Sequence, residues 1–318
     1  MTWWQAALLG LVQGLAEFLP ISSSGHLVLG QYVLGLDTEA ASDVTFEVFV
    51  HFGTALSILT VYRRRIARIL ADAVGALATP SAWAEAFGPG RIELARGDVP
   101  GSDPLSSDPP SSDPPSSDPP SSDPPSDTPP EAASRRVPSL RLALYVLVTM
   151  VPTGLGYVLF EDRLEAAFAN PRLVCGALIV TGILLLLTRL RPDPDGVLSP
   201  LKAVLVGIAQ TAALIPGISR SGSTICTAIY LNVDRKEAAD FSFLMLLPVV
   251  LGATLLKTLD LLEVGVTTEA VPLAVGTVVA FASGVFAIRA VQVLVQRRSL
   301  QYFAYYCFAV GGLGLVLI

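Results

Sequence analysis

The sequence predicts an all-α polytopic membrane protein with two inverted-topology repeats, each containing a re-entrant or broken helix segment that meets the other at a membrane-embedded site. The chain has 318 residues, of which 52% are hydrophobic and only 15% are charged. Soluble domains carry about 25% charged residues, and several apolar runs in this chain are long enough to cross a bilayer. In addition, residues 10–26 and 207–224 can be laid over each other without a gap, at a constant offset of 197. The composition predicts the class of protein, and the repeated segments predict where its site lies.

The two similar segments share their apolar helical positions and the residues that interrupt them. Each has a proline, Pro20 or Pro216, followed by a Ser/Gly turn that carries an ionisable residue. Such interrupted segments, in corresponding halves of a hydrophobic chain, are typical of half-helices that meet at a membrane-embedded site. Irregular backbone at membrane depth is tolerated only where protein buries it or a wet cavity adjoins it. The identical pairs are Gly10 and Gly207, Gln13 and Gln210, Ile21 and Ile218, Ser22 and Ser219, Ser24 and Ser221, and Gly25 and Gly222.

The first repeat is expected over residues 1–95, with a broken helix at 6–30 and a spanning helix at 46–62. No Lys or Arg precedes Arg63, and four arginines lie within residues 63–68, directly after that span. The positive-inside rule places this end of the span in the cytoplasm. The lack of a basic amino-terminal region also argues against a cleaved signal peptide.

Residues 96–137 are expected to form a disordered or semi-extended cytosolic linker. Four tandem copies of Ser-Ser-Asp-Pro-Pro run from Ser106 to Pro125, and such a stretch cannot bury apolar surface. Six aspartates between residues 103 and 127 account for the formal net charge of −6. The rest of the chain is close to neutral, so its charge indicates no nucleic-acid partner.

The remainder, residues 138–318, is expected to contain the other spanning helices and the second repeat. With alternating directions, every basic cluster falls on the cytoplasmic side, and the spans that follow the two motifs run in opposite directions. This alternation is the basis for predicting inverted repeats. Three cysteines in apolar surroundings, Cys175, Cys226 and Cys307, are interpreted as small buried hydrophobic residues. The expected elements are spans at 140–160 and 173–188, a broken helix at 201–231, and spans at 241–256, 271–295 and 302–318.

Polar side chains gather at the first break. Gln13 and Glu17 are four residues apart and therefore share one helix face. Residues 20–26 add three hydroxyl groups and the imidazole of His26 beside that face. Ionisable side chains at membrane depth are costly and usually functional, so the sequence predicts a site at this break.

The second break has the composition of a phosphate site. Arg220 lies between Ser219 and Ser221, and Thr224 can sit over the same turn. Free amides at the start of a helix and the fork of a guanidinium both favour phosphate oxygens. A diphosphate would use both halves of the chain at once.

Structural and non-enzymatic alternatives remain open. The hydroxyl groups could bond their own backbone, and Glu17 with Arg220 could form a purely structural ion pair. Glu47 and His51, also four residues apart, could support the site, carry a proton, or only satisfy each other. Inverted repeats with broken helices are also the layout of many membrane transporters and would suit a lipid flippase. The combination of carboxylate, hydroxyl, histidine and arginine favours a hydrolase over either.

With these residues in view, the chain resembles the undecaprenyl pyrophosphate phosphatases of bacterial membranes, also called bacitracin resistance proteins. Two signatures carry the resemblance: a Glu/Gln-x3-Glu element that runs into a Ser/Gly/His turn, here Gln13 to His26, and Pro-Gly-x-Ser-Arg-Ser-x2-Thr, here Pro216 to Thr224. The resemblance implies a multi-pass plasma-membrane enzyme that hydrolyses undecaprenyl diphosphate to the monophosphate and so recycles the lipid carrier for cell-wall synthesis. It also implies Mg²⁺ or Ca²⁺ as cofactor and a site that opens to the outer face.

The resemblance also assigns roles to individual residues. Gln13 and Glu17 match the positions that hold the metal, Ser23 and His26 match the candidate nucleophile and catalytic histidine, and Arg220 matches the phosphate-binding arginine. Whether Ser23, His26 or water attacks phosphorus stays open, as do the preferred metal, the prenyl chain length and a homo-oligomeric state. The catalytic set is thus Glu17, His26, Ser23 and Arg220, and the substrate-binding set is Gln13, Ser22, Ser24, Ser219, Ser221 and Thr224.

Overall fold

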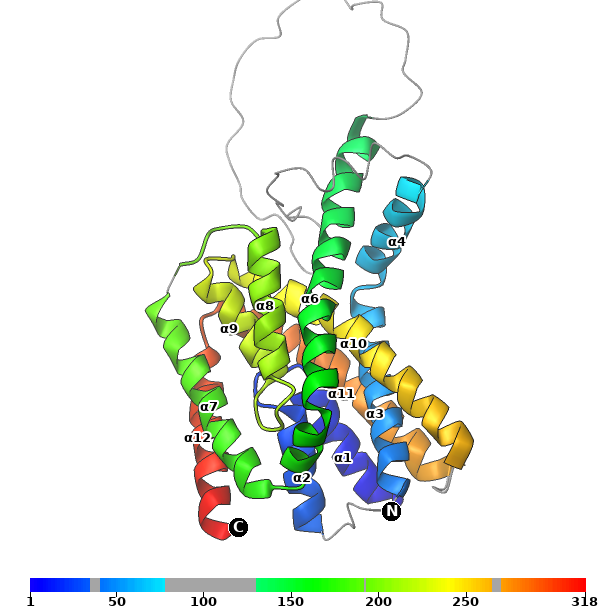
Figure 1. The fold of residues 1–318 in the computed structure, drawn as a ribbon, viewed down its shortest axis with the longest axis vertical. Helices are drawn as coiled ribbons and strands as arrows, with labels where there is room; N and C mark the ends of the chain where they lie inside the picture. Colours follow the sequence, from blue (N-terminus) through cyan, green and yellow to red (C-terminus); the bar gives the residue numbers. More distant parts are fainter. Residues whose placement is uncertain (35–40, 78–129, 192, 265–269) are drawn as a thin grey trace, which may run out of the picture.

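The computed structural model describes residues 1–34, 41–77, 130–191, 193–264 and 270–318, and every regular element in these ranges is a helix. The all-α class is therefore confirmed. Figure 1 shows the helices side by side in one bundle. In chain order they are α1 (Trp3–Ala16), α2 (Ser23–Leu34), α3 (Ala41–Val61), α4 (Arg63–Leu77), α6 (Pro130–Phe168), α7 (Pro171–Leu187), the 3-10 turn η1 (Thr188–Leu190), α8 (Pro200–Ala212), α9 (Arg220–Tyr230), α10 (Arg235–Val264), α11 (Ala270–Gln296) and α12 (Leu300–Leu317).

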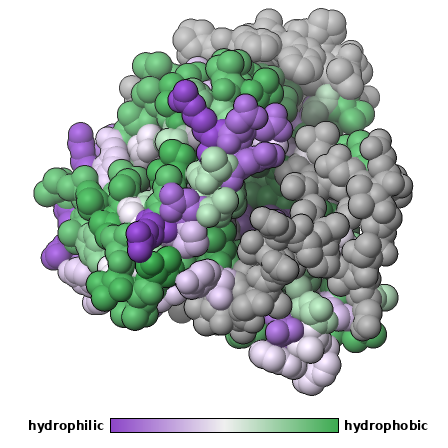
Figure 2. Space-filling model, turned by 60° about the horizontal axis from the view of Figure 1, so that its bottom comes forward, coloured by the Kyte–Doolittle hydropathy of each residue, from purple (hydrophilic) through white to green (hydrophobic). Residues whose placement is uncertain are grey.

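Within the described residues, several helices are long and apolar enough to cross a membrane by length and composition. Four qualify on their own: Leu140–Phe168, Pro171–Leu190, Ala270–Gln296 and Leu300–Leu317. A fifth span results if Thr45–Val61 and Arg63–Gly75, which are bent by 80° at their junction, count as one. Among the residues coloured by hydropathy in Figure 2, apolar ones predominate. These features confirm a multi-pass membrane protein.

The chain ends and the basic helix α4 lie at opposite ends of the bundle. In Figure 1 both termini lie at the bottom, whereas α4 and the beginning of α6 reach the top. α4 begins with three consecutive arginines at Arg63, so the positive-inside rule predicts that the top is the cytoplasmic end. The inverted relation between the two repeats stays a prediction.

The expected linker at 96–137 lies outside the described residues as far as residue 129. Its last eight residues belong to α6, which begins at Pro130. Proline is favoured at the first position of a helix, and the Glu, Ala and Arg residues that follow have high helix propensity. The helical part of the chain therefore begins earlier than its polar composition indicated.

Small residues let α1 approach α11 closely. A Cβ atom added at Gly10 would lie 2.5 Å from the carbonyl oxygen of Gly276, and one at Gly14 would lie 2.4 Å from that of Ala280. Neither distance leaves room for a larger residue. Close backbone approach through small residues is the usual way in which helices pack inside a membrane. This contact fixes α1, whose end carries the first motif.

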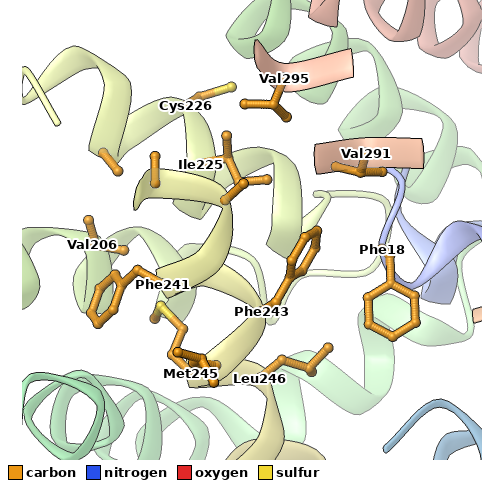
Figure 3. Packing of buried hydrophobic residues seen from close by; sticks show 14 of the residues in the cluster. Phe18, Val206, Ile225, Cys226, Phe241, Phe243, Met245, Leu246, Val291 and Val295 are labelled. Atoms are coloured by element: carbon orange, nitrogen blue, oxygen red, sulfur yellow. The ribbon is translucent and has the colours of Figure 1, made fainter. Parts of the chain in front are cut away.

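The main hydrophobic core joins the first break to the second half of the chain. Phe18, directly after α1, is fully buried and packs edge-to-face on Phe243 of α10, with ring centroids 5.7 Å apart. Ile225 of α9 and Val291 of α11 belong to the same cluster, as Figure 3 shows. The core thus places both broken segments against α10.

A buried polar network ties α3, α4, α10 and α11 together near the start of α4. Asp240 accepts hydrogen bonds from the hydroxyl of Tyr62 at 2.8 Å and from Gln292 at 3.0 Å. Arg65 forms an ion pair with the same carboxylate at 3.3 Å. A buried carboxylate needs such partners, because leaving it unpaired would be strongly unfavourable.

Candidate active site

Both motif segments are broken, and the breaks have the same cause. α1 ends at Ala16 and α8 ends at Ala212, each four residues before a proline. Pro20 and Pro216 lack the N–H that would bond those positions, so the helical ladder cannot continue. α1 and α8 end within the segments 6–30 and 201–231, where broken helices were expected.

Each break then turns sharply before the next helix begins. Ser22 has a φ of 72° and Gly217 a φ of 95°, and both values lie in the left-handed region. α9 starts at Arg220, where the side chain of Ser219 caps the helix by accepting a hydrogen bond from the N–H of Gly222 at 3.0 Å. Thr181 of α7 donates to the carbonyl of Gly217 and accepts from the N–H of Ser219, both at 2.9 Å. These bonds hold the second turn rigidly against α7.

The two breaks touch each other. The hydroxyl of Ser221 donates to the carbonyl of Leu19 at 3.1 Å, and a Cβ atom at Gly25 would lie 3.1 Å from the Cα of Gly217. Residues about 200 positions apart in the chain therefore form one polar centre, as the repeated segments predicted.

Glu17 is the centre of this polar cluster. One carboxylate oxygen, Oε1, accepts a hydrogen bond from Nη2 of Arg220 at 2.6 Å. The other, Oε2, accepts from Nε2 of Gln13 at 2.9 Å and from the hydroxyl of Ser23 at 2.7 Å. Glu17 is only 7% exposed, so its charge is balanced almost entirely by these neighbours. The ion pair between Glu17 and Arg220 that was one structural alternative is present, and the candidate nucleophile Ser23 donates a hydrogen bond to the same carboxylate.

Two polar atoms beside Glu17 have no hydrogen-bond partner. Nη1 of Arg220 and Oε1 of Gln13 are both buried, and neither makes a hydrogen bond. Because a carboxylate only accepts, Gln13 must turn its NH₂ group toward Glu17, which leaves its carbonyl oxygen pointing away. Buried polar groups are nearly always paired in folded proteins, so one unpaired donor and one unpaired acceptor indicate a ligand position.

His26 is held on both ring nitrogens. Nδ1 lies 2.8 Å from the carbonyl oxygen of Ser22, and Nε2 lies 2.8 Å from the hydroxyl of Tyr306 on α12. The two rings also stack, with centroids 5.5 Å apart and an interplanar angle of 11°. Since a carbonyl oxygen only accepts, Nδ1 carries a proton, and in the neutral ring Nε2 accepts a hydrogen bond from the hydroxyl of Tyr306. Ser23 is therefore paired with Glu17, whereas His26 is paired with Tyr306.

The other two hydroxyl groups of the first motif, those of Ser22 and Ser24, form hydrogen bonds within their own turn. Oγ of Ser22 lies 3.3 Å from Oγ of Ser24 and accepts a hydrogen bond from the N–H of Gly25 at 3.3 Å. These bonds shape the turn at the start of α2. A substrate-binding role for Ser22 and Ser24 stays a prediction.

The second motif shows the same local pattern. Oγ of Ser219 lies 3.3 Å from Oγ of Ser221, and the hydroxyl of Thr224 donates to the carbonyl of Arg220 at 2.8 Å. Thr224 also lies 2.6 Å from the hydroxyl of Ser242 on α10. These bonds fix the turn that presents the guanidinium, and contacts of Ser219, Ser221 and Thr224 with substrate stay predictions.

The other polar pair, Glu47 and His51, is not a side-chain pair. Nδ1 of His51 bonds the backbone carbonyl of Glu47 at 2.7 Å, and its Nε2 points to Glu17 at a distance of 4.0 Å from Oε2. Of the three alternatives for this pair, the geometry favours support of the site, because His51 on α3 faces the carboxylate of Glu17.

The oxygen atoms of Gln13 and Glu17 could serve as ligands for a divalent cation whose other ligands come from a substrate. Among the described residues, no group of three or more His, Cys, Asp or Glu side chains could hold a metal ion. The unpaired Oε1 of Gln13 and the carboxylate of Glu17 are nevertheless the hard oxygen donors that Mg²⁺ and Ca²⁺ prefer. Mg²⁺ in particular is commonly held by one or two protein oxygens together with substrate phosphates and water.

Comparison of the sequence with known proteins shows the family of the chain. The family model of the bacitracin resistance protein BacA matches residues 6–90 and 126–313. The chain belongs to the BacA family. An undecaprenyl-diphosphatase of Salinibacter ruber is 52% identical over 318 residues and covers the full length of both chains. Proteins of the same name from Desulfosudis oleivorans and Methanobrevibacter smithii are 36% and 33% identical, over 98% and 96% of this chain and 97% and 94% of their own.

Within this BacA-family chain, Tyr306 and Ser242 are the site residues that sequence reasoning missed. Tyr306 lies 280 positions after His26, in a span whose apolar pattern gives no sign of a polar contact. Ser242 is a single hydroxyl in α10, which usually bonds its own helix. Only the packing of α12 and α10 against the two breaks identifies them. The three cysteines are free and buried, as predicted.

Proposed function

We propose that this chain hydrolyses undecaprenyl diphosphate to undecaprenyl phosphate and inorganic phosphate, and thereby recycles the lipid carrier for cell-wall synthesis. Family membership and full-length relatives named undecaprenyl-diphosphatase support this activity. The observation that carries it here is the guanidinium of Arg220, which is buried beside a carboxylate and a serine and has one amine unpaired. A phosphate oxygen is the natural partner of such a group.

The arrangement suits phosphoryl transfer. Arg220 would bind the terminal phosphoryl group through Nη1 and neutralise charge that builds up on its oxygens. The hydroxyl of Ser23 would attack the terminal phosphorus and pass its proton to Oε2 of Glu17, to which it is already bonded at 2.7 Å. The bond from that phosphorus to the bridging oxygen would break, and undecaprenyl phosphate would leave. Water would then release inorganic phosphate from Ser23.

Two further parts of the proposal concern the cofactor and access. Gln13 and Glu17 would hold Mg²⁺ or Ca²⁺, which supplies positive charge against the diphosphate. The site would open to the outer face. The network around Asp240, which ties helix ends together on the basic side, supports access from the opposite side.

Phosphate release by purified protein tests the proposal. We would compare the wild type with Glu17→Ala and Arg220→Ala, with and without Mg²⁺ or Ca²⁺. Arg172→Ala is the matched control, because this exposed arginine binds the chain end at Ile318 and lies outside the polar centre. Loss of release in both site variants and normal release in the control is expected. Well-folded wild type that releases no phosphate from any polyprenyl diphosphate would favour a transporter.

The nucleophile needs a separate experiment. Acid-quenched reactions with substrate labelled at the terminal phosphate should contain phosphoserine, and Ser23→Ala should abolish it. Normal turnover by Ser23→Ala would instead make water the nucleophile, with Glu17 as the base.

A further inference from the structure

A second polar site lies at the cytoplasmic end of the bundle. A cavity of about 150 Å³ is lined by Thr188, Arg189, Arg235, Arg298 and Gln301. A single water molecule needs about 15 Å³ of such space, so the cavity has room for a phosphate group with several waters. The lining contains three guanidinium groups, two neutral polar side chains and no carboxylate.

The five lining residues come from separate parts of the chain that converge at helix ends. Thr188 and Arg189 form η1 at the end of α7, Arg235 is the first residue of α10, and Gln301 is at the start of α12. α7 and α12 run side by side in Figure 1. The cavity therefore lies where several helices begin or end.

Contacts hold two of the arginines, one with the backbone and one with a carboxylate. Arg235 is 7% exposed, and its Nη2 donates to the carbonyl of Arg191 at 2.8 Å. Arg298 has a φ of 58° in the turn between α11 and α12, a conformation that normally favours glycine. Asp193 forms an ion pair with Arg298, and the charge of Asp234 acts on Arg235, so two carboxylates oppose three guanidinium groups.

We propose that this cavity binds the phosphate group of an anionic lipid in the cytoplasmic leaflet. Basic pockets between membrane helices on the cytoplasmic side are suited to anionic headgroups. The planar fork of arginine matches phosphate oxygens, and Thr188 and Gln301 add neutral polar groups. Inorganic phosphate offers the same chemistry without the lipid chains. The inference does not depend on the proposed hydrolysis, because none of these residues belongs to the first polar centre.

Lipid binding to detergent-purified full-length protein tests the inference. We would titrate the protein with phosphatidylglycerol, phosphatidylcholine or inorganic phosphate and count bound molecules by native mass spectrometry. The test variant is Arg189→Gln with Arg298→Gln, since both side chains are exposed and their loss should not prevent folding. The control is Arg63→Gln with Arg64→Gln, which removes the same charge from α4, across the bundle in Figure 1.

The expected result is preferential binding of phosphatidylglycerol over phosphatidylcholine by the wild type and the control. The test variant should bind phosphatidylglycerol about 25-fold more weakly, from about fivefold for each arginine near a headgroup. Tight competition by inorganic phosphate would identify a free anion as the ligand, whereas competition by lipid alone would identify the headgroup. Equal weakening in test and control variants, or no weakening in the test variant, would overturn the inference.

Discussion

Replacement of Tyr306 by phenylalanine should lower phosphatase activity through His26, which matches the catalytic histidine of the family that the chain resembles. The hydroxyl of Tyr306 makes a 2.8 Å hydrogen bond to Nε2 of His26, and the two rings stack. Phenylalanine keeps the stacked ring and removes only the hydrogen bond, which is worth about 1 kcal/mol. We therefore expect kcat to fall about fivefold. KM should change little, because Tyr306 is a positioning residue that does not pair with the proposed phosphate ligand Arg220.

Initial rates of phosphate release over a pH series measure this effect. Tyr305→Phe is the matched control, since Tyr305 is the neighbouring tyrosine on α12 and is also exposed. In a His26→Ala background, Tyr306→Phe should cost nothing further, because residues that act through one another are not additive. Equal activities of the Tyr305 and Tyr306 variants would refute the reasoning. A full additional loss in the His26→Ala background would refute it as well.

Three other substitutions test separate parts of the structure. Arg220→Lys keeps the charge but loses the fork, so phosphate release should fall about 10- to 100-fold, as expected for a lost hydrogen bond to a charged group. Gly14→Ala would place a methyl group 2.0 Å from Oγ of Ser283, which should lower unfolding stability by about 1–3 kcal/mol and the melting temperature with it. Glu237 precedes the apolar part of α10, and burial raises its pKa from 4.5 to about 7. Its folded state thus binds more protons than its unfolded state between these values, so stability should fall as pH rises from about 4.5 to 7. Glu237→Gln can still accept from the N–H of Leu198, as Glu237 does at 3.2 Å, so thermal unfolding at pH 8 should occur at a higher temperature than in the wild type.

Local sequence patterns were sufficient for most of the fold and for the central part of the site. The end of α1 follows from the missing N–H of Pro20, and the meeting of Glu17 with Arg220 follows from the repeated segments. The 80° bend between α3 and α4 was not predicted, because Tyr62 gives no local signal for a break. It coincides with the network in which Tyr62 bonds Asp240, 178 positions away.

The contact of His26 with Tyr306 was missed for a similar reason. An aromatic residue in an apolar span is normally interpreted as a contact with lipid or with the core, and its hydroxyl can be assigned only when its neighbour is known. Sequence reasoning therefore finds polar groups that are anomalous in their own segment. It misses those that become significant only through packing between distant helices.

If the proposed cation binds beside Glu17, the two unpaired atoms there predict that substrate and cation bind cooperatively. Nη1 of Arg220 is a donor that a phosphate could satisfy, and Oε1 of Gln13 is an acceptor that a cation could satisfy. An anion alone would leave the glutamine oxygen unpaired and would lie near the carboxylate of Glu17. A cation alone would leave the arginine unpaired and would lie near its positive charge. Only the two together satisfy both atoms while keeping the local charge balanced.

This coupling can be measured without turnover. A non-hydrolysable diphosphate analogue should raise the melting temperature more in the presence of Ca²⁺ than the sum of the two separate shifts, and Ca²⁺ affinity should rise by the same factor as analogue affinity. Coupling of about 1–3 kcal/mol is typical between linked ligands. Gln13→Ala should reduce the coupling while leaving analogue binding without metal nearly unchanged, because the arginine is untouched. Simple additivity in the wild type would mean that the glutamine oxygen has another partner, and the assignment of Gln13 to the cation would then be wrong.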